Sequence, residues 1–308
     1  MLVTTWGSRG DFQPYLALAR GFRRAGHDVR LAGPDVSIFA DAAAEQDIPY
    51  IPAGGEFDPN ETARFLDSIL RGHDPIRQAR KIIEAYVVPS LETAYVATLD
   101  HARWSDIVVS HFFQPAGRMV AEATDRPWVS GSLAPMLPTS AYPPPLVPNL
   151  GRLVNRVAWW IAAEYVNRQW TPPINRVRAR MGLPPFRDLY RRDFFSPYLD
   201  LVGVSRYVAG RPLDWPRQTH ITGYWFLERP DWSPPTTLAA FLAAGPKPIA
   251  IGFGSMATED RAGLTRMVVE AVGRTGERAV LQSGWAELGG GDLPPSICLA
   301  GDVPHDWL

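Results

Sequence analysis

Cysteine is almost absent from this chain: Cys298 is the only one among 308 residues, so no disulfide can form within it. Charge of one sign is also missing. The 31 Lys and Arg residues balance 32 Asp and Glu residues, and without a basic block a nucleic-acid-binding surface is not expected. The most apolar window, residues 157–163, is bounded by Arg156 and Glu164 and is too short to span a membrane. Residues 1–5 are too short for a secretory signal, so we expect a cytoplasmic protein.

Two common nucleotide-binding loops are missing as well. The dinucleotide fingerprint needs G-x-G-x-x-G with an acidic residue about twenty positions later, whereas Gly7 and Gly10 are spaced G-x-x-G. A Walker A loop needs G-K-[ST], which does not follow them. These absences make a nicotinamide-dependent oxidoreductase the least favoured enzyme class. The first loop indicates an α/β ligand site of another kind.

That first loop, Gly7-Ser8-Arg9-Gly10-Asp11, lies between an apolar run at residues 1–5 and a predicted helix at 12–19. A strand, a two-glycine loop and a helix near a proline make a βα unit. The glycines permit a tight turn and close approach of a ligand, and open α/β sheets bind ligands at this edge. Asp11 is either a catalytic carboxylate or a helix N-cap, and Arg9 is either a ligand contact or a surface charge.

The order of predicted elements divides the chain. Short apolar strands alternate with helices over residues 1–222, which predicts an α/β, Rossmann-like, doubly wound domain with a parallel sheet. Residues 223–235 are rich in proline and are predicted to be a linker. The alternation restarts over 236–308 with three strands, whereas doubly wound domains normally carry five or more. We therefore expect a second domain of the same kind that is incomplete in this chain.

Several helices are predicted with interruptions. The longest covers residues 151–180 and is expected to break at Pro172-Pro173, because proline removes a helical hydrogen bond. Its tryptophans, Trp159 and Trp160, are expected in the core, whereas exposed rings would indicate an interfacial surface for a lipid acceptor. Two further helices are expected at 61–71 and at 76–100, the second bent or broken at Pro89.

Five short segments form a series along the chain. They are Gly7–Pro14 (GSRGDFQP), Pro135–Pro143 (PMLPTSAYP), Pro248–Met256 (PIAIGFGSM), Ser283–Trp285 and Gly301–His305. In type and order they resemble the motifs of one glycosyltransferase group, whose opening reads G-S-R-G-D-x-[QE]-P. That group contains the sterol glucosyltransferases and the glycopeptide-antibiotic (vancomycin-type) glycosyltransferases. The resemblance covers nearly the whole chain.

The resemblance implies a GT-B fold, with two Rossmann-like domains, the first for the acceptor and the second for a nucleotide sugar. It implies an inverting, metal-independent hexosyltransferase that uses a UDP-sugar or, less favoured, a dTDP-sugar. The acceptor would be a lipophilic hydroxyl compound such as a sterol or another natural product, and Asp11 would be the general base. The implied donor contacts are Arg9, Gly10, Ser255, Trp285 and Val303.

Candidates for the acceptor side follow a predicted strand and a proline-rich loop. His111 ends the strand at the ligand edge, where it either contacts the acceptor, assists Asp11 or is a structural histidine. Phe112 and Met136 are apolar candidates for the same pocket. No metal and no cofactor are expected besides the donor, and peripheral membrane contact is an open alternative.

The chain also departs from the family. A loop rich in His and Gly, which holds most of the diphosphate in that group, does not follow His305. We therefore expect that these residues do not turn over alone. The alternative function is a non-catalytic GT-B-like helper or binding module, and the intact Asp11, Arg9 and Ser255 favour the enzyme.

Overall fold

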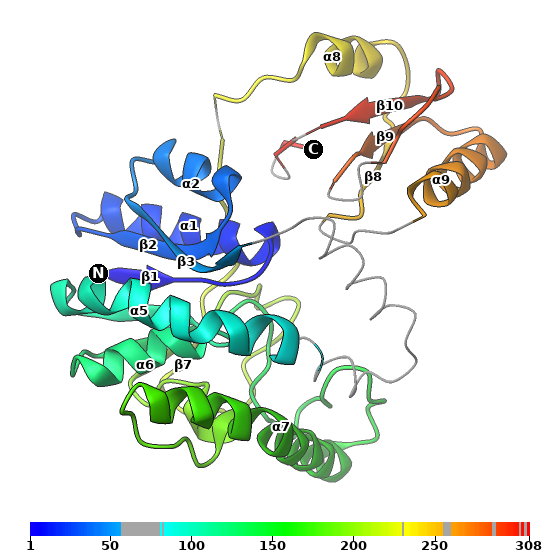
Figure 1. Ribbon diagram of the computed structural model, residues 1–308. Helices are drawn as coiled ribbons and strands as arrows, with labels where there is room; N and C mark the ends of the chain where they lie inside the picture. Colours follow the sequence, from blue (N-terminus) through cyan, green and yellow to red (C-terminus); the bar gives the residue numbers. More distant parts are fainter. Residues whose placement is uncertain are drawn as a thin grey trace. The chain divides into compact units, whose positions relative to one another are not determined.

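The computed structural model describes residues 1–56, 81, 83–229, 231–254, 260–284, 288–301, 303–304 and 307–308. Contacts between Cα atoms divide them into two units (Figure 1). The first comprises the described residues from Met1 to Phe226, and the second those from Leu227 to Leu308. The helix expected at 61–71 lies outside the described residues.

The first unit is built on a parallel sheet of seven strands in the order β3-β2-β1-β4-β5-β6-β7. The strands are β1 (Leu2–Thr4), β2 (Arg30–Asp35), β3 (Tyr50–Glu56), β4 (Val108–His111), β5 (Trp128–Ser132), β6 (Leu199–Val202) and β7 (Thr219–Ile221). Strands β4 and β5 are fully buried because helices cover both faces of the sheet. The predicted α/β class and parallel sheet are therefore confirmed.

Helices connect these strands. They are α1 (Arg9–Arg24), α2 (Ser37–Ala44), the π-helical turn η1 (Ile83–Val87), α5 (Val88–Trp104), α6 (Pro115–Ala123), α7 (Arg152–Arg180) and a second π-helical turn, η2 (Leu189–Asp193). Helices α1 and α2 lie on one side of the sheet and α5 and α6 on the other (Figure 1). Pro89 lies in the first turn of α5, directly after η1, so the helical path changes from π to α beside this proline.

The predicted break in the longest helix is wrong. Helix α7 runs unbroken from Arg152 to Arg180 through Pro172 and Pro173. Two helical hydrogen bonds are lost there, but buried side chains on both sides of the prolines, Trp170 and Ile174, fix the helix against the core. Tertiary packing thus outweighs the local preference of proline.

The second unit contains α8 (Thr236–Ala243), β8 (Ile249–Ile251), α9 (Arg261–Thr275), β9 (Ala279–Gln282) and β10 (Ile297–Ala300). Its described strands form a parallel sheet in the order β10-β9-β8. Strand β9 is central and its Ala279, Val280 and Leu281 are fully buried, whereas Ile249 in the edge strand β8 is 47% exposed.

A row of polar side chains crosses the large sheet from β1 to β7. The register aligns Thr4 with Ser110, Ser110 with Ser130, Ser130 with Asp200, and Asp200 with Thr219. All five residues are buried. The Ser130 hydroxyl donates a hydrogen bond of 2.6 Å to Asp200 Oδ1. Burial nevertheless raises the pKa of the Asp200 carboxyl to about 6.

The raised pKa of Asp200 predicts a pH-dependent stability. The unfolded chain releases this proton near pH 4 and the folded chain near pH 6, so stability falls as pH rises through this window. In Asp200→Asn that loss disappears. We expect the difference in free energy of unfolding, variant minus wild type, to grow by about 1–3 kcal/mol between pH 4.5 and 7. Urea unfolding followed by tryptophan fluorescence measures it.

The matched control is Asp47→Asn, which changes an exposed carboxylate in a turn with a φ of 53° that asparagine adopts readily. If the difference in free energy of unfolding between Asp200→Asn and the wild type varies with pH as little as that of the control, Asp200 has the same pKa in the folded and unfolded states.

Candidate active site

The loop after β1 is shaped by a glycine and a carboxylate. Gly7 has a φ of 94°, a conformation that strongly favours glycine. A Cβ atom at this position would lie 2.4 Å from Asp11 Oδ2. Both the backbone and the space therefore require Gly7, because the turn folds directly against Asp11.

Helix α1 begins with a capping box formed by Ser8 and Asp11. The Ser8 side chain accepts a hydrogen bond from the Gly10 N–H, and Asp11 Oδ2 accepts one of 2.9 Å from the Ser8 N–H. The Ser8 hydroxyl donates a second to the same oxygen at 3.2 Å. The N-cap is therefore Ser8, and the alternative that Asp11 is the N-cap is wrong. Asp11 is the third helical residue, and it reaches back to close the cap.

The other oxygen of Asp11 is not used by the cap. Oδ1 accepts no hydrogen bond from the described residues, and the side chain is 35% exposed. Burial raises the pKa of the carboxyl, while the two hydrogen bonds from Ser8 work in the opposite direction. The result is a carboxylate that is held at one oxygen, open at the other, and more basic than a free aspartate.

His111 lies beside that open oxygen. It ends β4, and its Nε2 is 3.8 Å from Asp11 Oδ1. Its Nδ1 accepts a hydrogen bond of 3.2 Å from the Phe113 N–H, which requires that the ring proton sits on Nε2. Burial of the ring lowers its pKa to about 3. His111 is therefore neutral, and its N–H faces Asp11 without forming an ion pair.

Tyr15, which sequence reasoning missed, lies in the same cluster as Asp11 and His111. Its hydroxyl donates a hydrogen bond of 2.7 Å to the Gly131 carbonyl, and its ring lies 5.5 Å from that of His111. A Cβ at Gly131 would lie 2.5 Å from the Tyr15 oxygen. Tyr15 thus joins α1 to β5 and fixes Asp11 relative to the sheet. The glycine within a buried strand was the available signal.

The remaining candidates of the first unit lie in different settings. Arg9 and Gly10 form the first turn of α1, and Arg9 Nε donates to Gln13 Oε1 at 3.3 Å. Phe112 is buried, 4.0 Å from the Phe113 ring between centroids, and so it is part of the core. Met136 is partly buried against the same core. Their contacts with donor or acceptor stay predictions.

In the second unit, Val303 is buried against Leu238 and Val280, while Ser255 and Trp285 lie outside the described residues. Among the described residues, no group of three or more His, Cys, Asp or Glu side chains could hold a metal ion. No helix in the described residues of either unit is long and apolar enough to cross a bilayer.

Comparison with known proteins shows which family the segment around Asp11 resembles. Residues 1–143, which include Gly7, Asp11, Tyr15 and His111, match the model of the glycosyltransferase family 28 N-terminal domain. The first 143 residues are therefore similar to this domain. The expected resemblance to sterol glucosyltransferases and natural-product glycosyltransferases is confirmed by the relatives below.

Curated relatives include the sterol 3-beta-glucosyltransferases of Emericella nidulans, 33% identical, and Penicillium rubens, 32% identical. Both alignments cover 99% of this chain, but only 22% and 23% of those proteins. The chain therefore spans less than a quarter of their length.

Solved structures include the glycosyltransferase of kitacinnamycin, with a TM-score of 0.61 and 21% identity, and the calicheamicin glycosyltransferase, with 0.59 and 18%. Both matches cover the whole of this chain and 70% of the solved chain. These structures confirm the predicted GT-B fold.

The sequence prediction that Asp11 is the general base can be tested by substitution. In Asp11→Asn the amide oxygen can still accept the Ser8 N–H, so the melting temperature should hardly change. Turnover should fall by about a hundredfold or more, because the general base is lost. Sugar transfer by the intact gene product that contains this sequence measures the effect.

Asp47→Asn serves again as the control, with a carboxylate removed far from the loop along the chain. Turnover of Asp11→Asn equal to that of this control would refute the assignment.

A second prediction concerns the ring of His111. Because its pKa is depressed to about 3, it should stay neutral between pH 8 and 5, with the proton on Nε2. Long-range ¹H–¹⁵N correlation spectra of the imidazoles, assigned with His111→Gln, report the protonation of each nitrogen. A titration of this ring near pH 6.5, the ordinary value, would contradict the neutral assignment.

Proposed function

We propose that this protein provides the acceptor side of an inverting, metal-independent glycosyl transfer from a nucleoside-diphosphate sugar to a lipophilic hydroxyl. The observation that carries the proposal is the Asp11 carboxylate at the sheet edge, capped at Oδ2 and open at Oδ1. The names of the relatives, sterol 3-beta-glucosyltransferases, support a sterol-like acceptor and a glucosyl donor.

The proposed step is a single displacement. Asp11 Oδ1 takes the proton of the acceptor hydroxyl while its oxygen attacks the anomeric carbon of the sugar. The bond from that carbon to the phosphate oxygen breaks, and the nucleoside diphosphate leaves with the electron pair. Attack on the face opposite the leaving group inverts the anomeric centre.

The surroundings of Asp11 suit this role. Partial burial raises the pKa of the carboxyl, which makes it a better base than a free aspartate. The neutral His111 adds no positive charge that would lower that pKa. Its Nε2–H can stabilise the carboxylate or orient the acceptor oxygen, since the His111 Nε2–H and the acceptor hydroxyl would both lie beside Asp11 Oδ1.

Donor binding is proposed for the loop and for the second unit. Arg9 and the N–H groups at the start of α1 can bind phosphate, because a helix N-terminus favours anions. Ser255, Trp285 and Val303 are the proposed contacts from the second unit. The names of the sterol relatives support a glucosyl donor, and UDP is proposed as its nucleotide from the sequence resemblance. The dTDP-sugar alternative is supported by a fold neighbour solved with thymidine diphosphate.

The test uses the intact gene product with UDP-glucose and a 3β-hydroxysterol, in the presence of EDTA. We expect formation of a sterol glucoside whose β-anomeric configuration, read from the ¹H coupling constant, shows inversion of the α-linked donor. Replacing the donor by dTDP-glucose compares the two nucleotides.

A glucoside with retained configuration would refute the single displacement. Tight binding of sterol without any sugar transfer would instead support the alternative, a non-catalytic GT-B-like helper.

A further inference from the structure

Helix α7 has two apolar faces, and only one of them is covered. The inner face packs in the core through Trp159, Ala163 and Trp170. The opposite face is also apolar and exposed. This outer face consists of Leu150, just before the helix, with Leu153, Val154, Val157, Trp160 and Ile161. The expectation that Trp160 packs in the core is therefore wrong, because its neighbour Trp159 takes the inward position.

The side chains of the outer face are largely open to solvent. Leu153 is 79% exposed, Trp160 60% and Val157 56%. Their spacing of three and four residues places them in one stripe on the helix. Contiguous exposed apolar surface of this kind marks a site of interaction rather than an ordinary protein surface.

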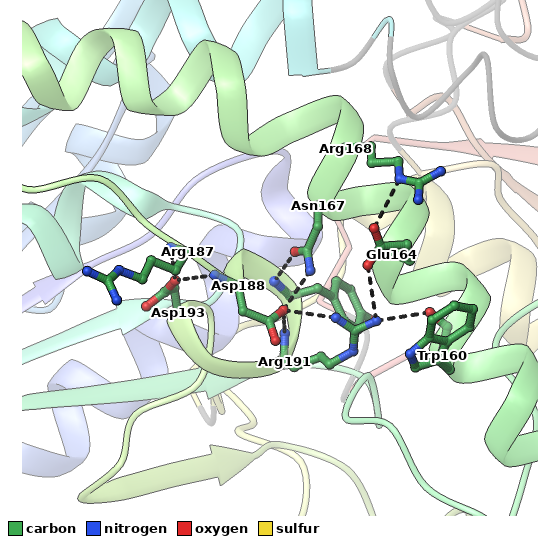
Figure 2. A network of polar contacts seen from close by, with 9 residues as sticks. Trp160, Glu164, Asn167, Arg168, Arg187, Asp188, Arg191 and Asp193 are labelled. Carbon is green, nitrogen blue, oxygen red and sulfur yellow. Dashed lines mark hydrogen bonds and ion pairs between the residues drawn. The ribbon is translucent and has the colours of Figure 1, made fainter.

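A polar network fixes the helix at the end of this stripe (Figure 2). The Arg191 guanidinium donates to the Trp160 carbonyl at 3.1 Å and lies 3.6 Å from Glu164 Oε2. Arg168 pairs with Glu164 at 3.0 Å, and the Asn167 amide donates to Asp188 at 2.6 Å. The η2 turn is thereby joined to α7, and the outer face is held on a fixed helix.

Positive charge predominates around the outer face, because Glu164 at its end is paired with Arg168 and Arg191. No Asp or Glu occurs between Asp125 and Glu164. The cations in the same stretch include Arg152 and Arg156, both exposed at the start of α7. Apolar side chains with an interfacial tryptophan and flanking arginines match the chemistry of a membrane surface with anionic head groups.

We propose that the outer face of α7 docks this protein on the surface of a lipid bilayer containing anionic lipids. The helix lies in the plane of the interface, its apolar stripe enters the boundary between head groups and acyl chains, and Arg156 at the side of the stripe contacts lipid phosphates. Membrane docking is a property separate from sugar transfer. It would bring the protein to the lipid phase, in which a lipophilic acceptor dissolves.

The test is co-sedimentation of the 308-residue chain with vesicles of phosphatidylcholine containing 30% phosphatidylserine, without donor or acceptor. We expect binding that Leu153→Glu/Val157→Glu weakens more than tenfold, because two apolar side chains that would enter the bilayer are lost and two negative charges are added. Arg156→Gln should weaken it about fivefold, and this effect should vanish at high salt.

The matched control is Val208→Glu/Leu213→Glu, which changes a valine and a leucine that are 70% and 92% exposed outside α7. Vesicle binding by this control should weaken only slightly, through the two added negative charges. Equal losses in the two double variants, or no vesicle binding by the wild type, would overturn the proposal.

Sedimentation velocity tests a different occupant of the outer face. The wild type could be a dimer that does not bind vesicles and that Leu153→Glu/Val157→Glu dissociates. That result would assign this face to a second copy of the chain and would also overturn the proposal. Because neither experiment involves sugar transfer, failure here leaves the proposed reaction untouched.

Discussion

The capping box of α1 is the constraint on which the candidate site depends. The two oxygens of Asp11 differ there: Oδ2 accepts a hydrogen bond from the Ser8 N–H at the start of the helix, and Oδ1 accepts none from the described residues. A helix start needs an acceptor for its unpaired N–H groups, and a base needs a fixed carboxylate. Gly7 makes the arrangement feasible, since a side chain at this position would overlap Asp11.

The sheet supplies the rest of the geometry. Strands β1 and β4 are neighbours, so the loop after β1 and His111 at the end of β4 meet at one edge. The Tyr15 hydrogen bond to Gly131 joins α1 to β5 and fixes the depth of the helix on the sheet. The site is thus assembled from three adjacent strands, although its residues are separated by more than a hundred positions in the sequence.

Much of this arrangement could be predicted from local patterns. Apolar runs between glycines and prolines predict the strands, and the motif around Asp11 predicts the loop that carries the candidate site. The N-cap was misassigned because Ser8 and Asp11 are both good capping residues and only the backbone geometry distinguishes them.

The errors elsewhere have tertiary causes. Burial of Trp170 and Ile174 keeps α7 intact through two prolines. Trp159 and Trp160 are adjacent in the sequence, but the rotation between consecutive residues of a helix turns one inward and the other outward. The polar row that includes Asp200 could not be seen either, because register across parallel strands depends on how the whole sheet pairs.

The most direct test of the account is the titration of Asp11 itself. ¹³C-carboxyl NMR of aspartate-labelled protein, with the resonance assigned by Asp11→Asn, gives its pKa. The hydrogen bonds from Ser8 favour the charged form and lower the pKa of this carboxyl, whereas its burial raises the pKa by more. The account predicts a pKa above the ordinary value and a change in the resonance when a hydroxylated acceptor is added. A pKa at or below the ordinary value, with no response to the acceptor, would contradict the assignment of Asp11 as the base.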